Sequence, residues 1–266
     1  MRRVARPHAA VVLLHAAAYL GAALLLLPLV ALVVRAPWSS AADLLHDDAA
    51  MTALRLSVVC SLGATAAAVG LGVPLAWLLA RRELPLKALL RSLVLVPLVL
   101  PPVAGGVGLL MAFGRTGVVG RWLDDAFGVT LPFTTGGAVL AEAFVALPFV
   151  VIAAETAIRA VDRTSEEVAR SLGAGRVEVA RRIVLPQARA GLAAGAVLAW
   201  ARALGEFGAT ITFAGSVPGR TTTLPLHVFF ALETGDTGPA VVLSLVLVAL
   251  SVTVLVALRQ RWLVVR

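Results

Sequence analysis

Two opposite charges, Arg202 and Glu206, lie four residues apart in the apolar run AWARALGEFGATITF. This spacing puts both side chains on one face of a helix. A charge at the centre of a bilayer costs at least about 2.5 to 3.5 kcal/mol, so both groups should face the interior of a helix bundle or water. Two uses are open: a structural ion pair, or a charged lining for a pathway across a membrane.

A charged, punctuated segment precedes that run: EEVARSLGAGRVEVARRIVLPQARAGL, residues 166–192. Thr164 followed three residues later by Glu167 is a capping-box pattern, which predicts a helix start. Gly173 predicts the stop of this first helix, and Pro186 predicts the end of a second, basic helix. The segment therefore reads as a helical hairpin.

Both helices of the hairpin are shorter than the roughly 12 to 15 residues that an isolated helix needs in water, so they must pack on something. One reading is that they pack only on the ends of their own membrane spans. The other is that the hairpin docks a soluble partner, with the small Ala169 allowing close approach.

Catalytic constellations are missing from the sequence. The four histidines form no H-E-x-x-H, and there is no G-x-S-x-G elbow. A Walker A loop needs a lysine after glycine, whereas the one lysine, Lys87, stands in ELPLKALL. The single cysteine, Cys60, supplies no thiolate cluster. We predict no catalytic residue and no metal site, and the chain is not by itself a P-loop ATPase.

The elements that hold these residues are membrane helices. The chain is 60% hydrophobic and 14% charged, where soluble domains have about 25% charged residues, and its mean hydropathy is +0.95. Each apolar window is close to the ~20 residues that cross a bilayer as a helix. We predict six spans, at residues 11–34, 56–80, 92–113, 137–158, 191–213 and 239–258.

The basic residues set the orientation. The segments assigned to the inside hold 17 Lys and Arg, and those assigned to the outside hold 5. Both termini are therefore predicted to be cytoplasmic. This bias accounts for nearly all of the net charge of +8, so no nucleic-acid partner is invoked. The first apolar run is too long for a signal-peptide core and is read as an uncleaved span.

The hairpin carries a resemblance to a known family. Its pattern E-V-A-x3-G-x9-I-x-L-P is similar to the E-A-A-x3-G-x9-I-x-L-P loop of ATP-binding-cassette importer permeases, with valine at one position where that family usually has alanine. In that family the loop is the coupling helix that docks on the ATPase subunit. The matching residues are Glu167, Ala169, Gly173, Ile183, Leu185 and Pro186.

Two flanking stretches, residues 96–120 and 200–225, resemble the permeases of molybdate and tungstate importers, which are closely related to sulfate permeases. Prolines and glycines also make the third span a poor regular helix, which is tolerated only where protein or a watery cavity surrounds it. A gate and simple close packing both remain open there. The candidate pathway or gate residues are Pro101, Pro102, Gly105, Arg202, Glu206, Thr210 and Thr212.

The resemblance implies an all-α, six-span permease of the type I ABC importer architecture, acting by alternating access in the cell membrane. Its cargo would be molybdate or tungstate; the alternatives are sulfate or thiosulfate and, in another class, a secondary transporter or channel. The implied partners are two ABC ATPase subunits that hold ATP and Mg, an extracytoplasmic substrate-binding protein and a second copy of this chain. The implied parts are a first transmembrane helix with its external loop (residues 1–50), a permease core (51–258) that contains the cytoplasmic coupling loop (159–190), and a cytoplasmic tail (259–266).

Overall fold

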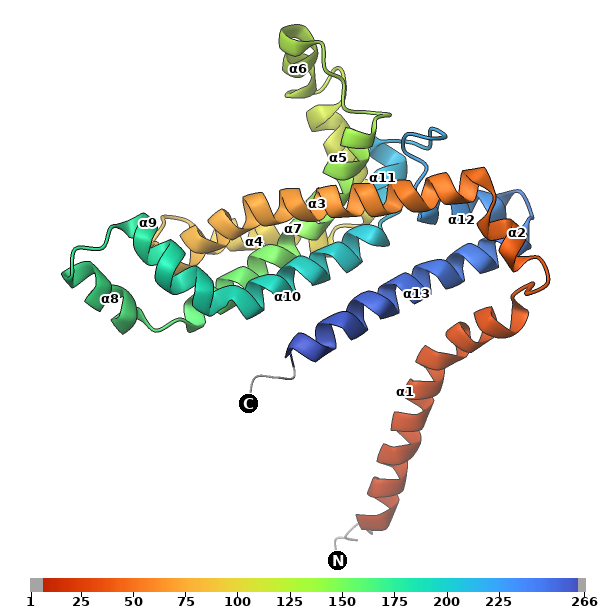
Figure 1. The fold of residues 1–266 in the computed structure, drawn as a ribbon, viewed down its shortest axis with the longest axis horizontal. Coiled ribbons are helices and arrows are strands. Elements are labelled where there is room, and N and C mark those ends of the chain that lie inside the picture. Colours follow the sequence, from red (N-terminus) through yellow and green to blue (C-terminus); the bar gives the residue numbers. More distant parts are fainter. Residues whose placement is uncertain (1–6, 263–266) are drawn as a thin grey trace, which may run out of the picture.

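The computed structural model describes residues 7–262, and every regular element in this range is a helix (Figure 1). The predicted all-α class is confirmed. The basic ends of the chain, residues 1–6 and 263–266, lie outside the described part. The elements are α1 (Pro7–Arg35), α2 (Ala41–Leu45), α3 (Asp48–Arg81), α4 (Lys87–Val99), α5 (Pro102–Phe113), α6 (Gly120–Phe127), α7 (Thr135–Ala160), α8 (Arg163–Ser171), α9 (Arg176–Val179), the π-helix η1 (Ala180–Val184), α10 (Leu185–Leu204), α11 (Gly208–Phe213), α12 (Leu224–Glu233) and α13 (Thr237–Trp262).

Five helical segments are long and apolar enough to cross a membrane, and the pair α4–α5 makes a sixth if it counts as one span. The sixth covers the predicted span 92–113, where the prolines and glycines predicted a poor regular helix, and α4 and α5 meet there at an angle of 118°. Leu100 and Pro101 are both extended between them. A residue before proline is pushed out of the helical region, and two consecutive prolines do this twice.

The predicted bounds of the fifth span, residues 191–213, are wrong. The helix begins earlier, at Arg176, and runs as one 29-residue segment to Leu204. Gly205 is its C-cap, and the short α11 begins three residues later at Gly208. Glycine disfavours helix continuation because it loses the most backbone entropy on ordering.

Small residues hold α3, α7 and α10 together in the centre of the bundle. A Cβ atom at Gly195 would lie 2.7 Å from Cβ of Ala153, and one at Gly191 would overlap Ala157, so α10 has no room for larger side chains against α7. Gly191 and Gly195, four residues apart on α10, therefore form a close packing contact with α7. A hydrogen bond of 2.9 Å from Nε1 of Trp200 to Oγ of Ser61 joins α10 to α3.

The arginine-rich segments gather at one end of the bundle, where α8 and α9 lie beyond the end of α3, while α2 and α12 lie at the opposite end (Figure 1). The helix α1 leaves this bundle as a separate arm. None of its side chains from residues 11 to 35 is buried, although the segment has a mean hydropathy of 2.5. Its apolar surface therefore needs lipid or another protein chain to cover it.

Candidate functional site

The first hairpin helix, α8, is capped by Asp162 and not by the predicted Thr164. Oδ1 of Asp162 accepts a hydrogen bond of 3.0 Å from the backbone N–H of Thr164, which lies inside the helix. Asp162 has the extended backbone that an N-cap residue needs. The capping box of Thr164 and Glu167 was therefore wrong by two residues, since aspartate provides the same carboxyl-to-amide bond.

The predicted stop at Gly173 is confirmed. Gly173 has φ +91°, in the left-handed region that favours glycine. The N–H of Gly173 donates a hydrogen bond of 2.9 Å to the carbonyl of Arg170. The N–H of Ala174 donates one of 3.0 Å to the carbonyl of Ala169. These two bonds form a Schellman motif, which satisfies the free carbonyls at the end of α8.

A buried carboxylate attaches α8 to the membrane helices. Glu166 is 3% exposed. Its Oε1 lies 2.6 Å from Nη2 of Arg81, at the end of α3, and its Oε2 lies 3.4 Å from Nη2 of Arg170. Removing one partner of a buried ion pair costs about 3 to 5 kcal/mol. Sequence reasoning missed this contact because Arg81 and Glu166 are far apart in the chain.

The hairpin presents apolar side chains to its surroundings. Val168 of α8 and its C-cap residue Leu172 are 55% and 83% exposed, and Val177 of α9 is 71% exposed. Glu167 is also exposed, whereas Ala169 packs against the core beneath the hairpin. The small Ala169 thus brings α8 close to its own bundle, and the surface left for a partner is formed by its neighbours on the other face.

The second hairpin helix does not stop at Pro186. The residues Ala180–Val184 form a π-helix, in which the N–H of Leu185 donates to the carbonyl of Ala180, five residues back. Such a wide turn moves the proline ring away from the carbonyl it would otherwise strike, so the helix continues into α10. Ile183 and Leu185 are half-buried beside this turn, and Val184 is fully buried.

A second group of predicted residues meets where α5 crosses α11 (Figure 1). The two short helices approach so closely that a Cβ at Gly106 would lie 2.5 Å from Cβ of Thr212, and one at Gly208 would lie 2.8 Å from Cβ of Pro102. Gly105 in turn faces the ring of Phe144. Both helices follow breaks in a span, so the backbone there is irregular inside the protein.

Arg202 and Glu206 form the predicted ion pair. Nη2 of Arg202 lies 2.6 Å from Oε2 of Glu206, and Oε1 of Glu206 accepts a hydrogen bond of 2.9 Å from the N–H of Ala209. The Glu206 side chain is 1% exposed and that of Arg202 is 31% exposed. The pair thus fixes the turn between α10 and α11 and leaves one edge of the guanidinium accessible.

The two candidate threonines differ in their surroundings. Thr210 is fully buried, and its Oγ1 has no hydrogen-bond partner among the described residues. Thr212 is half-buried, and its hydroxyl donates to the carbonyl of Gly208 at 2.8 Å. Only the Thr212 hydroxyl is occupied by its own helix.

Glu142 of α7 is a further residue of interest that is not among the predicted site residues, because sequence reasoning placed it near a membrane face. It is 1% exposed, and its Oε2 has no hydrogen-bond partner within the described part of the chain. Ala138, Ala141 and Ala146, on the surrounding turns of the same helix, are all fully buried. Such a run of alanines around one carboxyl was the available signal, since small residues mark close helix contacts in membranes.

Comparison with known proteins identifies the family. Residues 72–266 match the family described as "Binding-protein-dependent transport system inner membrane component". The chain is 46% identical over 235 residues to the molybdenum transport system permease protein ModB of Mycobacterium tuberculosis, covering 88% of each protein. It is 42% identical over 218 residues to ModB of Escherichia coli K12, covering 81% of this chain and 94% of that protein.

Solved structures share the fold. A bacterial ABC transporter that imports the acidic polysaccharide alginate has a TM-score of 0.73 at 16% identity, over 93% of this chain and 94% of that one. An amino acid ABC transporter has a TM-score of 0.57 at 20% identity, over 80% and 92%. The predicted type I permease fold is thereby confirmed. The chain belongs to the family of inner membrane components of binding-protein-dependent transport systems.

Proposed function

We propose that this chain is the permease subunit of an ATP-driven importer of molybdate or tungstate. The observation that carries the proposal is the 46% identity, over 88% of both chains, to a mycobacterial molybdenum permease. The cargo would be a tetrahedral dianion. Moving two negative charges into a cell that is about 100 mV negative inside costs about 2 × 2.3 kcal/mol before any concentration gradient, which calls for an energy source such as ATP.

In this proposal α8 is the element that docks on the ATPase subunit. Two observations support it: Val168 and Leu172 expose apolar surface, and the helix is held in place by Asp162, Gly173 and the buried Glu166. A rigid helix loses little entropy on docking, so more of the contact energy appears as affinity. ATP and Mg would bind to the partner subunit and not to this chain.

The gate of the pathway is assigned to the crossing of α5 with α11. Pro101, Pro102 and Gly105 would act on one side of this crossing, and Thr210 and Thr212 on the other. The accessible edge of Arg202 offers a positive charge close by, while Glu206 keeps that charge in position. Weak contacts of this kind would let the anion leave again, so tight selection would belong to the external binding protein.

Two copies of the chain are proposed to line one pathway and to receive two ATPase subunits. The apolar surface of α1, which its own bundle leaves uncovered, supports a second copy as one neighbour of this helix. Both termini would be cytoplasmic, on the same side as the hairpin. Attachment of a reporter enzyme that is active only in the cytoplasm to each terminus tests this orientation.

The test is uptake of labelled molybdate into vesicles that contain the permease, its ATPase and its binding protein. We expect uptake to require ATP and to be inhibited by excess tungstate, but not by phosphate or a polyamine. Competition by sulfate without competition by tungstate would instead identify a sulfate importer. Competition by the polyamine alone would refute an oxyanion cargo.

A further inference from the structure

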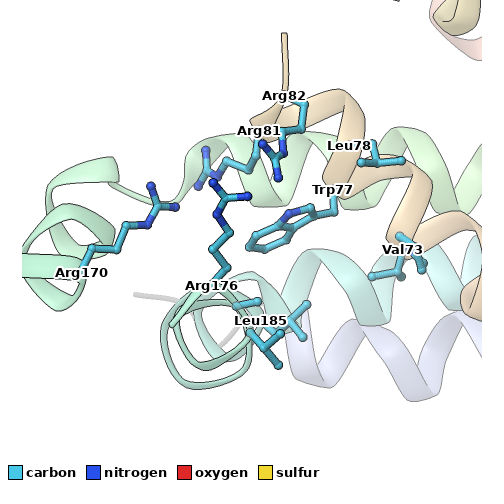
Figure 2. A pocket seen from close by; sticks show the side chains of 11 residues that line it. Val73, Trp77, Leu78, Arg81, Arg82, Arg170, Arg176 and Leu185 are labelled. Atoms are coloured by element: carbon cyan, nitrogen blue, oxygen red, sulfur yellow. The ribbon is translucent and has the colours of Figure 1, made fainter. Parts of the chain in front are cut away.

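A pocket of about 580 Å³ lies between the end of α3 and the hairpin, away from the proposed gate. Its lining divides into two parts (Figure 2). Four arginines form one part, and the ring of Trp77 with neighbouring aliphatic side chains forms the other. The lining residues are Val73, Pro74, Trp77, Leu78, Arg81, Arg82, Arg170, Arg176, Val177, Ala180 and Leu185.

The charges of the arginines are only partly neutralised by the protein. Arg81 and Arg170 share the carboxylate of Glu166. Arg82 and Arg176 form no ion pair with any residue between positions 7 and 262. The guanidinium groups of Arg81, Arg170 and Arg176 point toward a common space in Figure 2. The pocket thus holds a surplus of positive charge, which suits an anion with several oxygens.

The apolar part lies deeper along α3. Val73 precedes Arg81 by eight residues, which is about 12 Å along a helix at 1.5 Å per residue. On a membrane helix that ends at Arg81, the arginines lie nearest the headgroups, and Trp77 and Val73 lie about 6 and 12 Å further toward the acyl chains. Leu78 is 43% exposed in this wall. A ligand that covers Leu78 and the neighbouring apolar wall must present an apolar group to it.

We infer that this pocket binds an anionic phospholipid, with its phosphate among the arginines and part of an acyl chain against Trp77 and Leu78. A free oxyanion would satisfy the arginines and leave the apolar wall bare. The ATPase would meet Val168 and Leu172, and neither of these residues lines the pocket. The inference rests on the proposed orientation, because anionic lipids are enriched in the cytoplasmic leaflet.

Trp77 provides the probe. The complex of permease and ATPase is reconstituted in phosphatidylcholine bilayers with a small fraction of a lipid brominated on its acyl chains, either phosphatidylglycerol or phosphatidylcholine. Bromine quenches tryptophan fluorescence on contact, and subtraction of the signal of Trp77→Phe isolates Trp77 from the other tryptophans. We expect quenching by brominated phosphatidylglycerol at an about tenfold lower mole fraction than by brominated phosphatidylcholine.

The double variant Arg82→Gln/Arg176→Gln should lose this preference and still insert, because neither arginine pairs with another described residue. Arg181→Gln is the matched control: it removes an exposed arginine of the same segment that does not line the pocket, so the preference should persist. Equal quenching by both lipids would overturn the inference, as would relief of the quenching by millimolar phosphate or molybdate.

The lipid test needs no transport, so the two proposals can fail separately. A complex that shows the lipid preference but does not take up molybdate refutes the proposed cargo and leaves the lipid site intact. A complex that takes up molybdate but shows no lipid preference refutes the lipid site alone.

Discussion

Replacement of Gly173 by valine tests whether the end of α8 must be left-handed for the hairpin to couple ATP to transport. A Cβ at this position would meet no atom within 4 Å, so the substitution creates no clash. Its whole cost is conformational: φ is +91°, which disfavours residues with a side chain by about 1 to 2 kcal/mol, and more when the side chain is β-branched.

That cost falls on the two hydrogen bonds that close α8, from Gly173 to Arg170 and from Ala174 to Ala169. A loss of about 1.4 to 2.8 kcal/mol raises the open fraction of this helix end by about 10- to 100-fold. We expect amide hydrogen exchange in α8 to accelerate by that factor. Co-purification with the ATPase and molybdate uptake should fall, while the membrane helices keep their protection.

Gly175→Val is the matched control. Gly175 lies in the same exposed loop and also has open space around it, but its backbone is extended, with φ −69° and ψ 162°. Valine tolerates this conformation, so exchange and transport should stay near the wild-type level. Gly173→Asn should be intermediate, because asparagine enters the left-handed region more readily than valine. Wild-type transport by Gly173→Val, or equal loss in both valine variants, would refute the reasoning.

Three further predictions concern the gate and the docking surface. Arg202→Ala should lower the free energy of unfolding by up to about 3 kcal/mol, because it leaves the buried carboxylate of Glu206 without its partner. In thermal unfolding, the double variant Arg202→Ala/Glu206→Ala should recover part of this loss. Strictly additive losses would contradict the pairing. Gly106→Ala should cost about 1 to 3 kcal/mol and reduce uptake by forcing α5 away from α11, whereas Gly108→Ala, with no atom within 4 Å, should do neither. Leu172→Asp should abolish ATPase binding in a pull-down assay. The free energy of unfolding should stay within about 0.5 kcal/mol of the wild-type value, because the side chain is 83% exposed. Retained binding would exclude this face as the docking surface.

Local chemistry made part of the hairpin predictable from sequence. Gly173 ends a helix because glycine itself adopts the left-handed backbone conformation that the stop requires. The ion pair of Arg202 with Glu206 follows from their spacing of four residues along a helix. The cap was assigned to Thr164 in place of Asp162 because both residue types can cap and they lie two positions apart. Pro186 was read as a stop because single-sequence patterns assume regular turns, and the π-helix is not one.

Features that depend on distant parts of the chain could not be predicted. The burial of Glu166 depends on Arg81, and the burial of Glu142 depends on how α7 packs among its neighbours. The composition and the apolar windows predicted six spans, of which five are continuous helical segments and the sixth is the bent pair α4–α5. They were not enough for the 118° break between α4 and α5, since the angle at a proline pair is set by what the second segment packs against.

The π-helix also has a mechanical consequence. Because η1 carries the chain past Pro186, α9, η1 and α10 form one continuous helical segment of 29 residues, which starts in the hairpin and ends next to the Arg202–Glu206 pair. Its axis bends where α10 begins, so that α9 and α10 run in different directions in Figure 1. A displacement of the hairpin would therefore reach the Arg202–Glu206 pair through hydrogen-bonded helix, with no loop in between.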